Sequence, residues 1–239
     1  MWRCSRLLRK EVWRLIASME ELCAYLVEVQ SKRASEVRCE LTADMSARTS
    51  DAAIEEALVL GLPMAQGVKQ RILRSRGKGV VITAKVHYRE GVRMLCGAPL
   101  TKAESAALDL ARSIVQDVLA LDEAARFRYV YDWVCSNIQY AHTAPGQKGY
   151  EKLVGASGVL QEKQANCQGF ADVMYLLCGL CGIQCEYRIG RGERRLHVWN
   201  AVCLEGIWQD VDASKGARRL ESWQNFSKID IGAKKHYPR

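Results

Sequence analysis

One stretch constrains the fold more than any other: LHVWNAVCLEGIWQDVDAS (196–214) predicts a tight antiparallel hairpin. Glu205 and Gly206 form a two-residue turn signal between two segments of strand character, 197–204 and 207–213. Strands joined by so short a turn are antiparallel neighbours, so the chain must contain an antiparallel sheet here. Together with the helical segments described below, this predicts the α+β class.

The register of this hairpin brings two reactive side chains together. A two-residue turn pairs Leu204 with Ile207, and counting back along both strands places Trp199 opposite Asp212. His197 is then the diagonal neighbour of Asp212 on the same face of the sheet, where Cβ atoms lie about 7 Å apart. We therefore expect the His197 imidazole and the Asp212 carboxylate to lie within reach of each other.

Upstream, QANCQGFADVMYLLCGL (164–180) predicts a helix that begins at a cysteine. Asn166 is a favoured N-cap residue, and the apolar residues that follow recur with helical spacing. They are Phe170, Met174, Leu177, Cys178 and Cys181. Cys167 differs from the other cysteines because it lies on the first turn, where the helix dipole and free N–H groups lower a thiol pKa. Gly169 leaves room for another backbone to approach.

The other cysteines predict neither a disulfide framework nor a metal site. Cys178-x2-Cys181, with Cys185 beyond, resembles a zinc motif, but the first two lie on the apolar stripe and no second CxxC completes a site. We therefore expect a structural role for Cys178 and Cys181, no metal and no other cofactor. The ten cysteines are scattered and no secretory signal is recognisable, which favours reduced thiols in the cytoplasm.

The composition is that of an ordinary globular protein, with 49% hydrophobic and 26% charged residues. No apolar run reaches the ~18 residues that a membrane span needs. The net charge of +8 comes partly from two basic clusters, 69–78 and 188–195. Neither carries interleaved aromatic residues or a nucleic-acid-binding motif, so we expect no nucleic-acid partner. Because the second cluster precedes His197, it could instead favour acidic substrates.

The pattern of elements divides the chain near residue 100, into a small α+β extension of unknown role (1–100) and a second domain (101–239). In the extension, helical spacing from Leu8 to Leu26 predicts an amphipathic helix, for which docking on the body is favoured over binding to a membrane surface. A capping box from Thr101 to Glu104 opens the second domain with a helix. Further patterns predict strands at 35–42 and 80–88, and helices at 51–60, 64–75 and 122–138.

Three blocks resemble, in order and spacing, the signature blocks of the transglutaminase-like superfamily: CQGFA (167–171), HVWN (197–200) and WQDVDAS (208–214). The resemblance covers residues 101–214 and includes YDWVCSNIQY, which looks like the helix that leads into this core. It implies a papain-like core, in which the cysteine helix packs against the antiparallel sheet that carries the histidine and the aspartate. The first hundred residues carry no such resemblance.

The resemblance also implies a role for each matching residue. Cys167 would be the nucleophile, His197 the base and later the acid, and Asp212 the group that orients the imidazole. The Cys167 backbone N–H is a natural donor to the oxyanion. Gln161 has the offset of the oxyanion glutamine of papain-like proteases, although an ordinary polar loop residue is a slightly better reading. Trp199 would form a wall of the cleft.

Such a site implies thiol-dependent chemistry at amide bonds through an acyl-enzyme, with a peptide or protein as the substrate. The chain lacks the paired CxxC zinc motif of the deglycosylating branch of the superfamily, and its compact core favours a cysteine peptidase or amide hydrolase. Two alternatives stay open. One is acyl transfer from protein glutamine, as in cross-linking enzymes, and the other is a non-catalytic peptide-binding module of the same fold.

Overall fold

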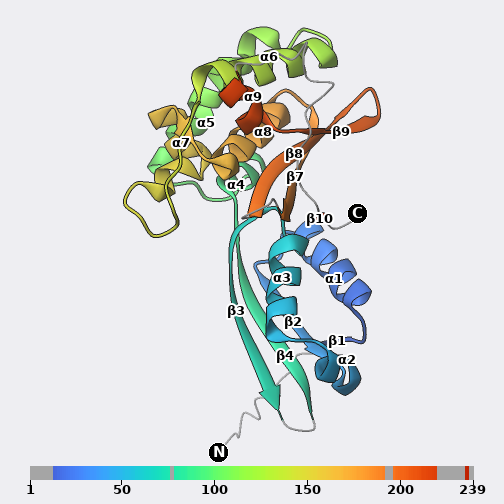
Figure 1. Ribbon diagram of the computed structural model, residues 1–239. Coiled ribbons are helices and arrows are strands. Elements are labelled where there is room, and N and C mark those ends of the chain that lie inside the picture. Colours follow the sequence, from blue (N-terminus) through green and yellow to red (C-terminus); the bar gives the residue numbers. More distant parts are fainter. Residues whose placement is uncertain (1–12, 76–77, 192–195, 220–234, 237–239) are drawn as a thin grey trace, which may run out of the picture. The chain divides into compact units, whose positions relative to one another are not determined.

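A computed structural model describes residues 13–75, 78–191, 196–219 and 235–236 of the chain (Figure 1). These residues mix helices with largely antiparallel sheets, which is the predicted α+β class. They form two compact units. The first holds the residues up to Leu62 together with Gly67–His87, and the second holds Pro63–Gln66 and the residues from Tyr88 onward.

The first unit is built on a four-stranded sheet in the order β1-β2-β4-β3. Its elements are β1 (Arg14–Ile16), α1 (Met19–Ser31), β2 (Glu36–Leu41), α2 (Ala43–Arg48), α3 (Asp51–Gly61), β3 (Ala65–Ser75) and β4 (Lys78–Tyr88). β1 runs parallel to β2, and β2 runs antiparallel to β4. Alternate residues of β2 are fully buried, as expected of a sheet with one face on a core.

The predicted strands at 35–42 and 80–88 and the predicted helix at 51–60 are confirmed. The predicted helix at 64–75 is wrong, because this segment is β3. Val68 and Ile72 lie four residues apart, which mimics a helical face, but both are β-branched and suit a strand. Pairing with β4 satisfies the backbone of the segment and overrides its local pattern.

The predicted amphipathic helix from Leu8 to Leu26 begins outside the described residues. Its described part is confirmed from Met19 onward, where Leu22 and Leu26 are buried in α1, and is wrong before Met19. Arg14–Ile16 is a strand beside β2, and α1 begins only at Met19. Ser18 sets this start, because its side chain accepts a hydrogen bond from the N–H of Glu21.

The second unit combines a sheet in the order β10-β7-β8-β9 with a group of helices. Its first elements are α4 (Glu90–Leu95), α5 (Lys102–Val115), η1 (Gln116–Val118), α6 (Glu123–Asn137), β5 (Gln139–Tyr140), η2 (Tyr150–Leu153) and α7 (Ala156–Glu162). There follow β6 (Gln164–Ala165), α8 (Cys167–Leu180), β7 (Gln184–Arg191), β8 (Leu196–Leu204), β9 (Ile207–Val211), α9 (Ala213–Arg219) and β10 (Lys235–His236). The capping box of Thr101 and Glu104 and the helix predicted at 122–138 are confirmed.

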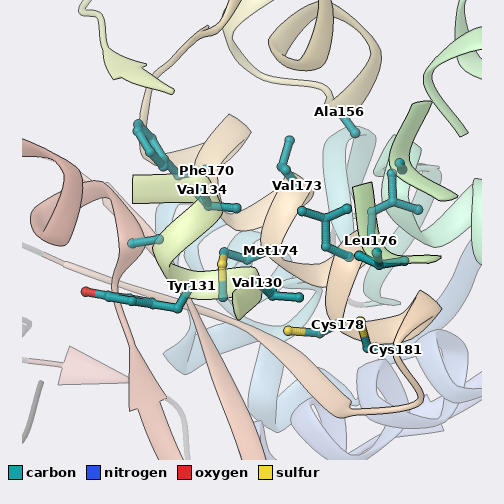
Figure 2. Packing of buried hydrophobic residues seen from close by; sticks show 14 of the residues in the cluster. Val130, Tyr131, Val134, Ala156, Phe170, Val173, Met174, Leu176, Cys178 and Cys181 are labelled. Atoms are coloured by element: carbon teal, nitrogen blue, oxygen red, sulfur yellow. The ribbon is translucent and has the colours of Figure 1, made fainter. Parts of the chain in front are cut away.

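Helix α8 forms the centre of the core of this unit (Figure 2). The residues of its predicted apolar stripe are all buried: Phe170, Met174, Leu177, Cys178 and Cys181. Val130 and Val134 of α6 belong to the same cluster. On its other side α8 packs against β7 and β8, so the cysteine helix lies on an antiparallel sheet, as predicted.

Two absences concern the described residues only. Within them, no group of three or more potential metal-ligating side chains comes together. None of the helices in those ranges combines the length and apolar character needed to cross a bilayer.

Candidate active site

The hairpin of β8 and β9 has the predicted register. Asn200 pairs with Val211, which leaves Glu205 and Gly206 as the turn. Both turn residues have positive φ, 52° and 79°, as a type I′ turn requires. Asp212 follows the last residue of β9 and precedes α9, so its side chain lies at the end of the strand pair.

This register brings His197 and Asp212 into a hydrogen bond, with Nε2 of His197 2.6 Å from Oδ2 of Asp212. The Asp212 side chain is 1% exposed. Its other oxygen, Oδ1, accepts hydrogen bonds from the Ser214 hydroxyl at 2.6 Å and the Lys215 N–H at 3.2 Å, which fix the carboxylate. Because Asp212 occupies Nε2, the ring nitrogen left for a second partner is Nδ1.

Cys167 is the first residue of α8, directly after the capping residue Asn166. Oδ1 of Asn166 accepts hydrogen bonds from the N–H groups of Gln168 at 2.9 Å and Gly169 at 3.3 Å. The Phe170 N–H bonds to the Asn166 carbonyl at 3.0 Å. Among the described residues, none accepts a hydrogen bond from the Cys167 N–H. That N–H is available to an oxyanion on a substrate.

A close backbone approach holds the start of α8. A Cβ on Gly169 would lie 2.2 Å from the carbonyl oxygen of Leu153 and 2.6 Å from Cγ2 of Val159. Both distances are far below van der Waals contact, so only glycine fits where η2 and α7 meet α8. The predicted close approach at Gly169 is confirmed by these distances.

The thiol and the imidazole stabilise each other's charged form. Burial raises the pKa of Cys167, but the hydrogen bond and charge of His197, with the Val198 N–H, outweigh it and lower the pKa overall. Burial lowers the pKa of His197, whereas hydrogen bonds to Asp212 and Cys167 raise it to about 9. Burial raises the pKa of Asp212, but bonds to His197 and Ser214 lower it overall. The interactions within this row therefore favour the thiolate of Cys167, the imidazolium of His197 and the carboxylate of Asp212 over their neutral forms.

The two cleft candidates differ in their positions. Trp199 is buried and stacks on His197, with ring centroids 5.8 Å apart and planes 17° apart. Its Nε1–H donates to Asp210 at 3.1 Å. Gln161 lies near the end of α7 with an exposed side chain, and in the described part of the chain it makes no hydrogen bond with Cys167. The structure thus brings Trp199, but not Gln161, against the candidate triad.

Several buried polar side chains received no role from the sequence, among them Ser214 and Asp172. Ser214 holds the Asp212 carboxylate, and Asp172 of α8 accepts a hydrogen bond from Tyr187. A signal for Asp172 was present, because a carboxylate in a helix that is apolar on most sides is seldom buried unpaired. Ser214 lies in the same sequence block as Asp212, but the spacing alone does not show that the Ser214 hydroxyl donates a hydrogen bond to the Asp212 carboxylate.

Comparison with known proteins finds a match to one family model and similarity to several proteins. Residues 109–213 match the family model described as Transglutaminase-like superfamily. Proteins called Kyphoscoliosis peptidase from Homo sapiens and Mus musculus are each 31% identical to this chain over 124 residues. These matches cover 46% of this chain and 18% of each relative, so the chain spans less than a fifth of their length. The match to a solved structure described as a TGase covers 84% of this chain and 59% of that chain, at 11% identity and a TM-score of 0.42.

Proposed function

We propose that the protein is a thiol-dependent enzyme that acts on amide bonds through an acyl-enzyme, on the premise that residues 109–213 match the transglutaminase-like superfamily model. The form that we favour is a cysteine peptidase or amide hydrolase. The observation that carries the proposal is the row in which Asp212 holds His197 and His197 bonds to the Cys167 thiol. The curated relatives are named peptidases, which favours hydrolysis.

In the first half-reaction, the Cys167 thiolate attacks the carbonyl carbon of the amide, and an electron pair moves to the carbonyl oxygen. The Cys167 N–H donates to this oxyanion. As the C–N bond breaks, the His197 imidazolium gives a proton to the leaving nitrogen. The products are a free amine and a thioester on Cys167.

In the second half-reaction, neutral His197 takes a proton from a water molecule whose oxygen attacks the thioester carbonyl. The C–S bond then breaks, which releases a carboxylic acid and restores the Cys167 thiolate beside the imidazolium. Asp212 keeps the ring oriented and its charge compensated throughout. An amine in place of water gives a new amide, which is the acyl-transfer alternative.

The substrate that we propose is a peptide or protein. A preference for acidic substrates has little support. Residues 192–195 of the basic cluster lie outside the described residues, and Arg188 is already paired with Glu186 at 2.7 Å and lies 3.9 Å from Asp210. The proposal includes a reducing compartment such as the cytoplasm, because Cys167 can act only as a free thiol.

Active-site labelling tests the nucleophile without knowledge of the substrate. The protein is treated briefly with iodoacetamide at neutral pH and mapped by peptide mass spectrometry. We expect Cys167 to react first, ahead of Cys178, Cys181 and Cys203, because its anion is stabilised. Earlier labelling of any of the other three would contradict the assignment.

A screen of peptide and glutamine-amide substrates tests turnover. The wild type is expected to release ammonia, an amine or a new N-terminus, and Cys167→Ala and His197→Ala should each remove almost all of this activity. A binding module would instead hold its peptide equally well with Cys167→Ala and form no product. If a genuine ligand binds both proteins alike and the wild type never turns it over, the binding alternative replaces the enzymatic one.

A further inference from the structure

A buried carboxylate lies on the helix that carries the proposed nucleophile. Asp172 is 0% exposed. Its Oδ1 accepts hydrogen bonds from the Gly91 N–H at 3.1 Å and the Tyr187 hydroxyl at 2.6 Å. Its Oδ2 accepts one from the Ala156 N–H at 2.9 Å. An ionised carboxylate is only an acceptor, so it suits three donors. One side chain of α8 thus reaches α4, α7 and β7.

This carboxylate accepts a hydrogen bond from the first turn of both α4 and α7. Arg89 and Gly155 hold the N-cap positions of the two helices, and neither makes a side-chain capping bond. Asp172 supplies an acceptor to the first turn of each helix, and in α7 the Ser157 N–H also donates to Oε2 of Glu90 at 2.7 Å. The fit is tight at Gly91, where a Cβ would lie 2.9 Å from Oδ1 of Asp172. The position of α8 against its neighbouring helices is therefore closely fixed.

The same part of α8 is also bonded twice to the sheet. Tyr187 of β7 pairs directly with Asn200 of β8, and each is 1% exposed. Their partners on α8 are consecutive, because Tyr187 bonds to Asp172 and Nδ2 of Asn200 donates to the Ala171 carbonyl at 3.1 Å. Hydrogen bonds shielded from water in this way are strong and directional. β8 is also the strand that carries His197.

The surrounding charges keep Asp172 ionised at neutral pH. Burial raises its pKa to about 6, and the Tyr187 hydroxyl, the Arg89 guanidinium and the N–H groups of Ala156 and Gly91 limit that rise. Arg89 is itself 2% exposed, and its guanidinium carbon lies 5.1 Å from the centroid of the Tyr187 ring. At neutral pH the ionised carboxylate can therefore accept all three of its hydrogen bonds.

We propose that Asp172, Tyr187 and Asn200 are positioning residues that set the separation of the Cys167 thiol and the His197 imidazole. This inference deepens the proposed function and rests on it. Because α8 carries the thiol and β8 carries the imidazole, a slide of the helix along the sheet would separate the two groups. The two helix-to-sheet bonds lie about one helical turn from the nucleophile, where they oppose such a slide.

The test compares thiol reactivity in variants that differ in these bonds. Tyr187→Phe removes one hydroxyl and keeps the ring, and Asn200→Ala removes the second bond. Val173→Ala is the matched control, because it weakens the packing of the same helix and leaves both bonds in place. Iodoacetamide alkylation of Cys167 is followed against pH, well below the thermal midpoint of each protein. The exposed Cys96 serves as an internal reference for the reagent.

Loss of either bond is expected to raise the apparent pKa of Cys167 by about half a unit, which slows its alkylation roughly threefold at pH values below that pKa. Val173→Ala should lower the thermal midpoint and leave the pH profile of Cys167 alkylation unchanged, because weaker core packing alone does not alter the thiol pKa. Circular dichroism shows which variants fold. If Tyr187→Phe does not fold, the profile of Asn200→Ala provides the test. A wild-type profile in every folded variant that lacks one of these bonds overturns the inference. Failure of Cys167 to react first in the wild type overturns the proposed function instead.

Discussion

At the scale of single residues, His197 governs the charge on Cys167 more than the helix start does. The sequence suggested that free N–H groups at the start of α8 would lower the thiol pKa. In the structure Asn166 already binds two of these groups, and the lowering comes first from the hydrogen bond and charge of His197. The helix start positions the thiol, and the imidazole supplies the opposite charge.

His197→Ala tests this dependence. The variant keeps the burial that raises the pKa of Cys167 and the Val198 N–H that lowers it, but it loses the hydrogen bond and the charge of His197. The pKa should therefore move up toward or above that of an ordinary thiol. Alkylation of Cys167 in this variant should then require a more alkaline solution than it does in the wild type. His87→Ala, at an exposed histidine of β4, is the control and should leave the pH profile unchanged. An unshifted profile in His197→Ala would contradict the thiolate–imidazolium pair.

Asp212→Asn should change the pH dependence of turnover more than it changes the nucleophile. In the wild type, activity is expected to fall as pH rises through about 9, where His197 loses the proton that the leaving group needs. A carboxamide removes the charge that raises this pKa, so the alkaline limb should move to lower pH, with a smaller loss of rate than in Cys167→Ala. Asp117→Asn, at an exposed carboxylate of η1, is the control and should keep the limb in place. A fixed limb in Asp212→Asn would remove Asp212 from its assigned role.

At the scale of elements, the features predicted from the sequence are those with local signals. The cap at Asn166 marks the start of α8, and the Glu205-Gly206 turn fixes the register that joins His197 to Asp212. The strand at 64–75 was missed because its structure depends on pairing with β4 rather than on its own pattern. Asp172 was missed for a similar reason, since its three donors lie on α4, α7 and β7.

Substitutions at the two residues of the turn between β8 and β9 should change the free energy of unfolding in opposite directions. Glu205 adopts a φ of 52°, which asparagine tolerates better than glutamate, so Glu205→Asn should raise the free energy of unfolding by a few tenths of a kcal/mol. Gly206 has a φ of 79°, and Gly206→Ala should lower the free energy of unfolding by about 1 kcal/mol. Urea unfolding measures both changes. Two shifts of the same sign would mean that the turn is not of type I′.

At the scale of the whole molecule, the unit that holds the site begins before residue 100. It includes α4, whose Gly91 N–H bonds to Asp172, and it includes Pro63–Gln66. The Arg89 N–H donates to the Met64 carbonyl at 3.0 Å, and Nε of Arg89 donates to the Pro63 carbonyl at 2.9 Å. A boundary drawn near residue 100 therefore cuts through hydrogen bonds that support α8.

The position of this boundary can be tested by comparing the stabilities of three fragments of the chain. Residues 63–239 keep every bond just named. Residues 88–239 lose the Pro63 carbonyl, which leaves a buried donor of Arg89 unpaired and should lower the free energy of unfolding by about 1–3 kcal/mol. Residues 101–239 lose α4 altogether, so Asp172 is left with fewer donors in a buried site and the loss should be largest.

Thermal unfolding ranks the three fragments, and selective alkylation of Cys167 shows whether each retains an assembled site. We expect the selectivity to follow the same order as the stability, because the bonds lost in the shorter fragments are those that hold α8. The full chain is the reference for both measurements. If residues 101–239 match residues 63–239 in stability and in thiol selectivity, the boundary near residue 100 is the right one and α4 does not support the site.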